Sequence, residues 1–225
     1  MKNSRLLTIL LAIAAALVLL AGAIALPILC RPFYYAHIGP LHLTEQTGLT
    51  EEEIRTAYDE MLDYCLGAEE FSTGVLRYSQ SGMDHFTDVR RLFLLDLWVL
   101  WGSAVALAVL LIAARLARRR SARLLGRGPC FWAGAGLGVV FLVVGGLAAL
   151  DFDRAFVVFH ALFFPGKDNW LFDPDTDQII TILPQVFFRN CAILILAVLI
   201  LGCAALIAAD FLSARRQKRT GANGG

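Results

Sequence analysis

The chain has 225 residues, 58% of them hydrophobic, and a mean hydropathy of +0.65. This exceeds the roughly 45–50% apolar content of ordinary soluble domains, so the composition excludes such a domain and predicts an integral membrane protein. The formal net charge of +1 gives no indication of a nucleic-acid partner, and we expect none.

Four apolar runs are each long enough for the about 20 residues that a membrane-spanning helix needs. They cover residues 6–29, 92–114, 130–150 and 191–212. The first run also allows a cleaved signal peptide, but it is longer than the roughly 7–15-residue apolar core of such a peptide, which favours a retained span. We therefore predict an all-α integral membrane protein, a single domain over 1–225 with four transmembrane helices. Its two polar segments, 31–91 and 151–189, are expected to form a small extracytoplasmic cap.

Positive charge lies at three places outside the predicted spans. Lys2 and Arg5 precede the first span. The loop between the second and third spans contains six arginines, namely Arg115, Arg118, Arg119, Arg120, Arg123 and Arg127. A third basic group follows the fourth span and consists of Arg215, Arg216, Lys218 and Arg219. Because basic loops stay in the cytoplasm, both termini are predicted to be cytoplasmic and both polar segments to lie outside. The arginine-rich loop is explained by contact with anionic lipid.

The first polar segment contains a predicted amphipathic helix. Thr50 and Glu53 have the spacing of a capping box. Apolar side chains then recur at helical intervals, and Gly67 is a plausible stop; the apolar positions are Ile54, Tyr58, Met61, Leu62 and Cys65. Such a helix needs a surface to cover, so we interpret it as part of the cap.

His85 lies where this polar segment becomes the second apolar run. Ser81 resembles a helix cap, which would place His85 in the first turn, where the positive helix end favours the neutral imidazole that a general base requires. Asp88 lies one turn further on and is a candidate to orient the ring. An interfacial histidine beside an ordinary first-turn acid explains the spacing equally well. Asp96 lies deeper, and a functional role, an ion pair with Arg189 and proximity to headgroups all remain open.

The second polar segment begins with an aromatic run around His160. Phe152, Phe156, Phe159 and Phe163 recur at helical spacing, which predicts a helix that lies along the interface or extends the third span. One interpretation of these rings is a wall suited to packing acyl chains and excluding water. A generic belt of interfacial aromatics is the competing interpretation.

Other patterns indicate structure rather than chemistry. Glycines within the third span are typical of close helix packing in lipid. The acidic run 173–177 lacks the glycine and glutamate of a calcium loop and is interpreted as a cap of the fourth span. Cys30 and Cys65 are both predicted outside, and a bridge between them remains open. Because no tight ligand spacing occurs among the histidines, we expect no metal.

Two patterns together resemble the bacterial lipoprotein intramolecular transacylase family. The first is His85-x-x-Asp88-Val89, at the mouth of the second span. The second is Phe159-His160-x-x-Phe163-Phe164, followed by Trp170, Phe172, Asp173-Pro174, Asp177, Ile180, Pro184 and Phe188. The family has four spanning helices with an extracellular cap, and the resemblance in length and layout covers nearly the whole chain.

The resemblance implies a reaction at the outer face of the bacterial cytoplasmic membrane. The substrate is a diacylated lipoprotein held in membrane lipid, and its sn-2 acyl chain moves from the glyceryl group to the α-amino group of the N-terminal cysteine, with no cofactor. We expect His85 and His160 to be catalytic, with His160 favoured as the base, His85 aided by Asp88 as the electrophilic partner, and the reverse assignment open. The expected acyl-binding residues are Phe159, Phe163, Phe164 and Trp170.

A different class of function is also compatible with this layout. A non-enzymatic membrane chaperone or sensor would use the cap to bind a partner protein. Changing either histidine would then be silent, whereas changes on the face formed by Ile54, Tyr58 and Met61 would not. Oligomeric state and the preferred lipoprotein are not specified by these patterns.

Overall fold

The computed structural model describes residues 2–222, and the side chains of Lys2, Lys218 and Arg219 lie outside what it describes. The chain is mostly helical and divides into two compact units. Unit 1 comprises Met1–Ala23, Trp98–Gly146 and Leu196–Gly225, and unit 2 comprises Ile24–Leu97 and Leu147–Ile195.

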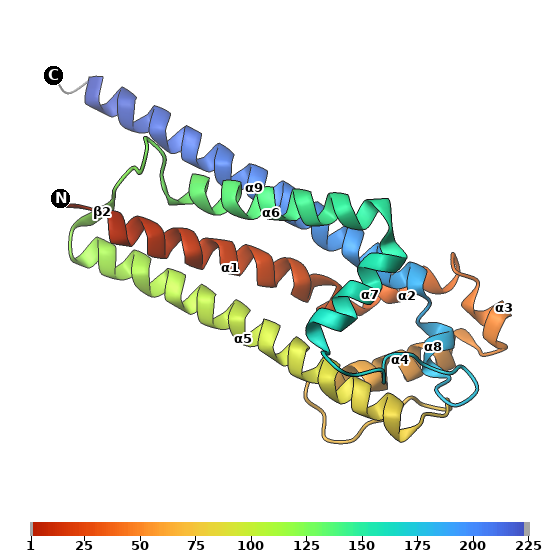
Figure 1. The fold of residues 1–225 in the computed structure, drawn as a ribbon. Helices are drawn as coiled ribbons and strands as arrows, with labels where there is room; N and C mark the ends of the chain where they lie inside the picture. Colours follow the sequence, from red (N-terminus) through yellow and green to blue (C-terminus); the bar gives the residue numbers. More distant parts are fainter. Residues whose placement is uncertain (1, 223–225) are drawn as a thin grey trace. The chain divides into compact units, whose positions relative to one another are not determined.

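Four helices are long and apolar enough to cross a membrane, which confirms the four predicted spans (Figure 1). They are α1 (Arg5–Leu29), α5 (Gln80–Leu116), α6 (Pro129–Leu150) and α9 (Gln185–Ala222). With 37 residues, α5 is about 55 Å long, well beyond the about 30 Å thickness of a hydrocarbon core. Its apolar part begins near Leu92, so the turns from Gln80 to Arg91 precede the segment that we assign to the membrane.

Close glycine contacts pack three of the long helices within unit 1. A Cβ atom on Gly134 would lie 2.7 Å from the carbonyl oxygen of Cys203, and one on Gly202 would lie 2.3 Å from Leu19. These contacts join α6 to α9 and α9 to α1. The small residues of the third span therefore serve helix packing, as the sequence predicted. Gly136 and Gly146 have no such neighbour within 4 Å.

The arginine-rich loop of unit 1 has a structure that the sequence did not predict. β1 (Lys2–Ser4) pairs in parallel with β2 (Arg119–Ser121). Asp210 of α9 is 3% exposed, and its carboxylate accepts hydrogen bonds from the Gly128 amide at 2.9 Å and from Arg123 at 2.8 Å. One buried acid thus holds the loop to α9.

Unit 2 adds short helices around its own hydrophobic core. They are α2 (Arg31–Ile38), α3 (Leu43–Thr47), α4 (Glu51–Cys65), α7 (Phe152–Phe163) and α8 (Ile179–Ile182). The capping box of α4 is confirmed, since Thr50 Oγ1 accepts from the Glu53 amide and Glu53 accepts from the Thr50 amide. The predicted apolar face of α4 is buried. Tyr34 of α2 stacks on Tyr58 with ring centroids 3.7 Å apart.

Arg90 connects the end of α4 to α5. Its guanidinium donates hydrogen bonds to the carbonyl oxygens of Tyr64, Gly67 and Ala68 and lies over the Tyr64 ring. These carbonyls belong to the last turn of α4 and the residues that follow it, which lack helical partners of their own. The contact fixes α4 against the first turns of α5.

Two predicted helix caps were wrong. Helix α5 begins at Gln80, and Ser79 rather than Ser81 caps it, with its Oγ accepting from the Gly82 amide at 3.0 Å. His85 therefore lies in the second turn. Asp177 does not cap the fourth long helix; its carboxylate accepts from the amide and hydroxyl of Ser79, because the loop after α7 folds back onto α5.

Helix α7 is separate from α6. The side chain of Asp151 accepts a hydrogen bond from the Arg154 amide at 2.9 Å, which starts a new helix at Phe152 instead of extending the third span. All five cysteines are free, so Cys30 and Cys65 are not bridged.

Candidate active site

The two predicted catalytic histidines lie together inside unit 2. His85 comes from α5 and His160 from α7, and their ring centroids are 5.9 Å apart with an interplanar angle of 28°. The residues are 5% and 6% exposed, so both rings are removed from water. Two distant segments of the chain thus place two imidazoles next to each other.

Aromatic rings enclose this pair. Phe164 is buried and lies 5.0 Å from His85 and 5.6 Å from His160, centroid to centroid. Trp170 stacks on His160 at 4.4 Å. Phe172 lies 5.4 Å from His85, and Phe156 lies 4.3 Å from His160. The histidines therefore lie between aromatic rings of α7 and of the segment after it.

The other two predicted acyl-binding residues lie further out. Phe159 is 5.5 Å from His160, and Phe163 contacts Phe159 at 4.7 Å. Both are nearly half exposed, so they face outward from α7 while Phe164 and Trp170 line the histidine pair.

The hydrogen bond of His160 fixes which ring nitrogen is basic. Nδ1 lies 2.7 Å from the carbonyl oxygen of Phe156, one turn earlier on α7. A carbonyl only accepts, so Nδ1 must carry the proton, and Nε2 holds the free lone pair of the neutral ring. Burial lowers the pKa of His160 from its ordinary value. The geometry suits a general base.

His85 is also held in its neutral form. Burial is the largest cause that lowers the pKa of His85 to about 4, and the nearby His160 adds to it, while Asp88 and Asn169 act in the opposite sense. The Nδ1 atom of His85 is buried and has no hydrogen-bond partner among the residues that the structure describes. A neutral, partly unsatisfied imidazole in an apolar site is typical of a functional group rather than of a packed core.

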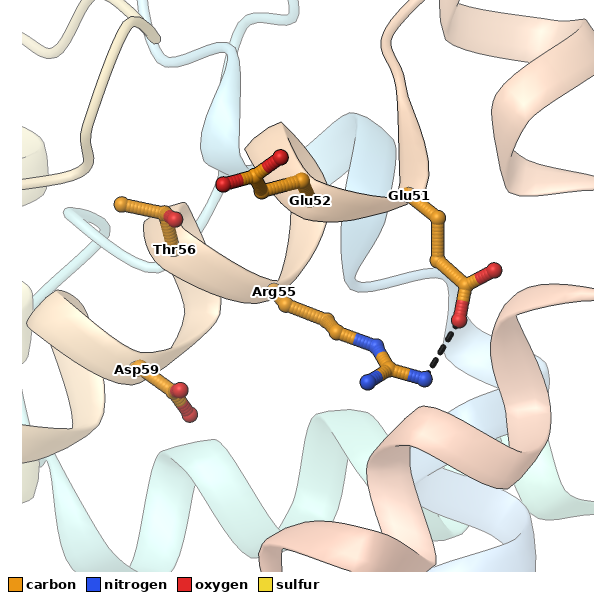
Figure 2. Close-up of a pocket in the computed structure, with 5 residues that line it drawn as sticks. All are labelled: Glu51, Glu52, Arg55, Thr56 and Asp59. Carbon is orange, nitrogen blue, oxygen red and sulfur yellow. Dashed lines mark hydrogen bonds and ion pairs between the residues drawn. The ribbon is translucent and has the colours of Figure 1, made fainter.

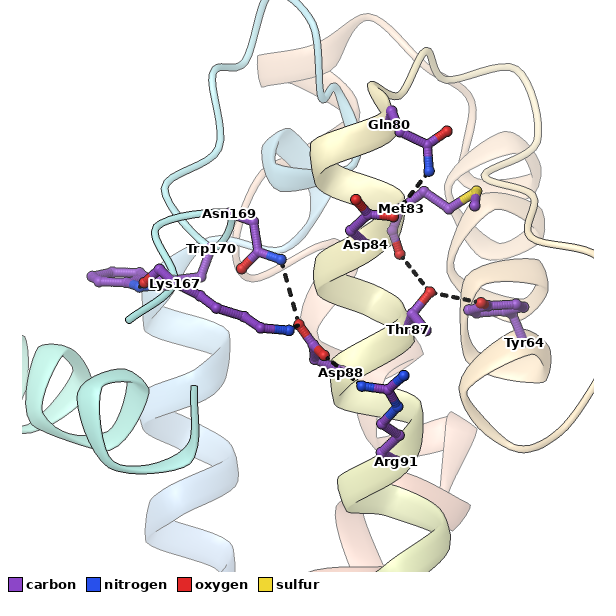
Figure 3. Close-up of polar contacts among 10 residues, drawn as sticks. All are labelled: Tyr64, Gln80, Met83, Asp84, Thr87, Asp88, Arg91, Lys167, Asn169 and Trp170. Atoms are coloured by element: carbon purple, nitrogen blue, oxygen red, sulfur yellow. Dashed lines mark hydrogen bonds and ion pairs between the residues drawn. The ribbon is translucent and has the colours of Figure 1, made fainter. Parts of the chain in front are cut away.

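Asp88 anchors the loop between α7 and α8 (Figure 3). Its Oδ2 accepts from Lys167 at 2.5 Å and from Asn169 at 3.4 Å, and its Oδ1 accepts from Arg91 at 3.3 Å. Burial alone would raise the pKa of Asp88, but these partners more than offset it and the pKa is lowered. Within the described chain Asp88 has no hydrogen bond to His85, so its effect on that ring is electrostatic or runs through the loop.

Sequence reasoning did not assign four residues of this site. Phe156 lies on the predicted helical stripe and Phe172 in the family-like pattern, so a signal existed for both. Lys167 and Asn169 lie in a polar loop with no local periodicity. Only the fold brings that loop to Asp88.

Elsewhere in unit 2 two features lie apart from the histidines. A shallow polar pocket on the outside of α4 is lined by Glu51, Glu52, Arg55, Thr56 and Asp59, and Arg55 donates to Glu51 at 2.5 Å (Figure 2). It contains none of the predicted site residues. Asp96 has one buried carboxylate oxygen without a partner in the described part of the chain.

Together, the fold and the site define a membrane-integral helical protein with a pair of buried, neutral histidines between aromatic walls. The model for the family described as lipoprotein intramolecular transacylase Lit matches residues 9–188. The chain therefore belongs to the lipoprotein intramolecular transacylase family and is an acyltransferase.

Solved structures resemble the whole chain. A structure of the membrane-integral lipoprotein intramolecular transacylase Lit from Bacillus cereus is 23% identical, covers 96% of this chain and 97% of its own, and superposes with a TM-score of 0.84. Two further structures of that protein, with H85R and H85A mutations in its own numbering, are 23% identical and give TM-scores of 0.77. Each covers 96% of this chain, and 94% and 95% of its own respectively. No curated protein matches the chain by sequence.

Proposed function

We propose that this protein moves the sn-2 acyl chain of a lipoprotein's S-diacylglyceryl cysteine onto the α-amino group of the same cysteine. The product is the lyso-form lipoprotein. The observation that carries the proposal is the pair of buried, neutral imidazoles 5.9 Å apart in an aromatic enclosure. Donor and acceptor belong to one molecule, so the protein's task is to hold them in an attack geometry and to move protons.

The two histidines divide the proton transfers. His160 presents Nε2 as a base, since its Nδ1–H is bound to the Phe156 carbonyl. It removes a proton from the amine as the N–C bond forms. His85 takes up the other proton of the α-ammonium and, as imidazolium, stabilises the tetrahedral oxyanion and donates this proton to the glyceryl oxygen as the ester C–O bond breaks.

The aromatic residues form the acyl-binding surface. Phe164 and Trp170, which contact the histidines, hold the part of the acyl chain next to the ester. Phe159 and Phe163 continue this surface outward along α7, where their exposed rings meet membrane lipid and the rest of the chain. Water is excluded from the reacting atoms, which limits hydrolysis of the ester.

The site faces the outer side of the bacterial cytoplasmic membrane in this proposal, with both termini in the cytoplasm. Arginines of the loop between α5 and α6 support this orientation, because basic loops remain inside. Unit 2 then carries the extracytoplasmic residues, including both histidines.

The test is mass spectrometry of lipoprotein N-terminal peptides from a bacterial host that leaves its lipoproteins diacylated. The host expresses the wild-type protein, a His85→Ala or His160→Ala variant, or no protein. The proposal predicts the N-acyl, S-monoacylglyceryl form, with unchanged total mass, in the wild-type sample alone. Peptides that keep both acyl chains on glycerol in a strain with good expression would overturn it.

A further inference from the structure

Two of the three buried polar side-chain atoms that lack a partner in the described residues lie in this site, on His85 and Asn169, which are close enough for the Asn169 side chain to affect the pKa of His85. The two atoms are Nδ1 of His85 and Oδ1 of Asn169. A buried acceptor beside a buried ring nitrogen, each without another partner, is completed by one shared proton. We infer that Asn169 is a positioning residue whose Oδ1 accepts a hydrogen bond from Nδ1–H of His85.

The surroundings of Asn169 fix the orientation of its amide. Asp88 accepts a hydrogen bond from Nδ2 of Asn169, and an ionised carboxylate has no proton to donate. Rotating the amide by half a turn would place two oxygen atoms against each other. Nδ2 therefore faces Asp88, and Oδ1 is the atom available to His85.

Asp88 is in turn held by two cations. Lys167 donates to it at 2.5 Å and Arg91 at 3.3 Å. Burial would raise the pKa of the Asp88 carboxyl group, but these partners outweigh burial, so the pKa is lowered. The carboxylate is thus ionised throughout the range in which a histidine titrates. It can orient the Asn169 amide without taking up the proton itself.

The loop that carries Asn169 contacts both histidines. Trp170, the next residue, stacks on His160 at 4.4 Å, and its indole nitrogen donates to the carbonyl oxygen of Lys167 at 3.2 Å. Figure 3 shows Lys167 and Asn169 directed toward Asp88 from the same loop. One short turn therefore supports His160 with a ring and His85 with an amide.

The inferred tautomer gives His85 a defined role in the proposed transacylation, and that role rests on the proposed function. With Nδ1–H bound to Asn169, neutral His85 presents the Nε2 lone pair to the substrate. The α-ammonium must lose two protons as the amide forms. His85 takes one at Nε2 and, as imidazolium, donates it to the departing glyceryl oxygen, while His160 takes the other and releases it to solvent.

Histidine ¹⁵N NMR of the full-length protein in detergent tests this directly. The chain has four histidines, so His→Asn variants at the other positions assign the spectrum. We expect wild-type His85 to show a protonated Nδ1 and an unprotonated Nε2. In Asn169→Leu, which keeps the approximate shape but removes the acceptor, the ring should change to the Nε2–H tautomer or a mixture.

Asn169→Asp supplies the second variant, because it keeps the acceptor and remains informative if the leucine variant does not fold. It should retain Nδ1–H, with the new carboxyl group sharing a proton with the Asp88 carboxylate in place of the lost Nδ2 donor; the other charged groups that face the ring, His160 and Lys167, are unchanged. Turnover should fall about tenfold or more in Asn169→Leu and recover in part in Asn169→Asp. Gln80→Ala, which removes an exposed hydrogen bond in the first turn of α5, is the matched control and should change neither readout.

An Nε2–H tautomer in the wild-type protein, or a His85 spectrum that is unchanged in Asn169→Leu, would overturn the inference. The NMR measurement of the tautomer does not require turnover, so it tests the role of Asn169 independently of the proposed function. The predicted tautomer in a protein without transacylase activity would contradict only the proposed function. Normal activity with the opposite tautomer would contradict only the role of Asn169.

Discussion

Each compact unit contains a buried aspartate that holds a loop to a long helix, and the two differ in what lies beyond the carboxylate. Asp210 of unit 1 binds Arg123 and the Gly128 amide, and that network ends there with its polar atoms satisfied. Asp88 of unit 2 binds Lys167, Arg91 and Asn169, but the Asn169 amide oxygen has no partner in the described residues.

The difference separates a structural anchor from a site. Proteins leave few buried polar atoms unsatisfied, so a completed network is explained by stability alone. A network that ends in an unsatisfied amide and an unsatisfied imidazole needs a further explanation, and the proposed catalytic role supplies one. The comparison predicts opposite outcomes of mutation: loss of activity around Asp88, and loss of stability around Asp210.

The largest effect is expected at the two histidines. His85→Ala and His160→Ala should each lower the transacylation rate by roughly 10²- to 10⁴-fold, the usual contribution of a positioned acid or base. Initial rates with a diacylated lipopeptide in detergent measure this. His42→Asn is the control, because His42 is exposed and has a positive φ that asparagine tolerates. Full activity in either alanine variant would place the chemistry elsewhere.

Removing the anchor of unit 1 should affect stability and not chemistry. Asp210→Ala leaves Arg123 and the Gly128 amide without their buried partner and should cost about 3 kcal/mol or more. Thermal unfolding in detergent measures the loss, and the rate per folded molecule should be unchanged. Ser213→Ala, which removes hydrogen bonds only to carbonyls of its own helix, is the matched control. A catalytic defect in folded Asp210→Ala would end the contrast between the two aspartates.

Acid should destabilise unit 2 through His85. Burial, chiefly, lowers the pKa of this histidine to about 4, so below about pH 6.5 the unfolded chain binds a proton that the folded chain does not. The free energy of unfolding should therefore fall by about 1–3 kcal/mol as the pH drops from 6.5 toward 4. His85→Phe should lose this part of the slope. Identical slopes in the variant and the wild type would show that His85 is not held neutral.

The smallest of these effects is expected at the junction of α5 with the loop after α7. A Cβ atom on Gly82 would lie 2.1 Å from Oδ1 of Asp177, so Gly82→Ala must displace the carboxylate that binds Ser79. We expect a loss of roughly 1–2 kcal/mol, measured as a lower unfolding temperature. A Cβ atom on Gly39 would have no neighbour within 4 Å, so Gly39→Ala is the control and should be tolerated. Equal stability of the two variants would mean that this junction is not close-packed.

Local patterns predicted the elements that depend on neighbouring residues. The four apolar runs and the capping box at Thr50 are examples, since a helix and its cap are determined within a few turns. The two histidines were assigned to one site through a family resemblance, and the fold places their rings together.

Contacts between distant segments were not predictable in the same way. Asp177 has the spacing of a local cap, but its carboxylate binds Ser79, almost a hundred residues earlier. Asn169 lies in a polar loop with no periodic pattern, and its relation to His85 depends on where that loop folds. Asp210 was an isolated acid in a basic region until the fold placed Gly128 beside it.

The central claim is tested most directly by an acyl crossover experiment with the purified protein. Two diacylated lipopeptides that differ in peptide mass are mixed, and only one carries an isotopically heavy sn-2 acyl chain. The account predicts N-acylated products of unchanged mass, with the heavy chain confined to its original peptide, in wild-type but not in His85→Ala or His160→Ala reactions. Three results would contradict it: heavy acyl groups on the peptide that began with an unlabelled chain, released fatty acid as the main product, or equal conversion by the variants.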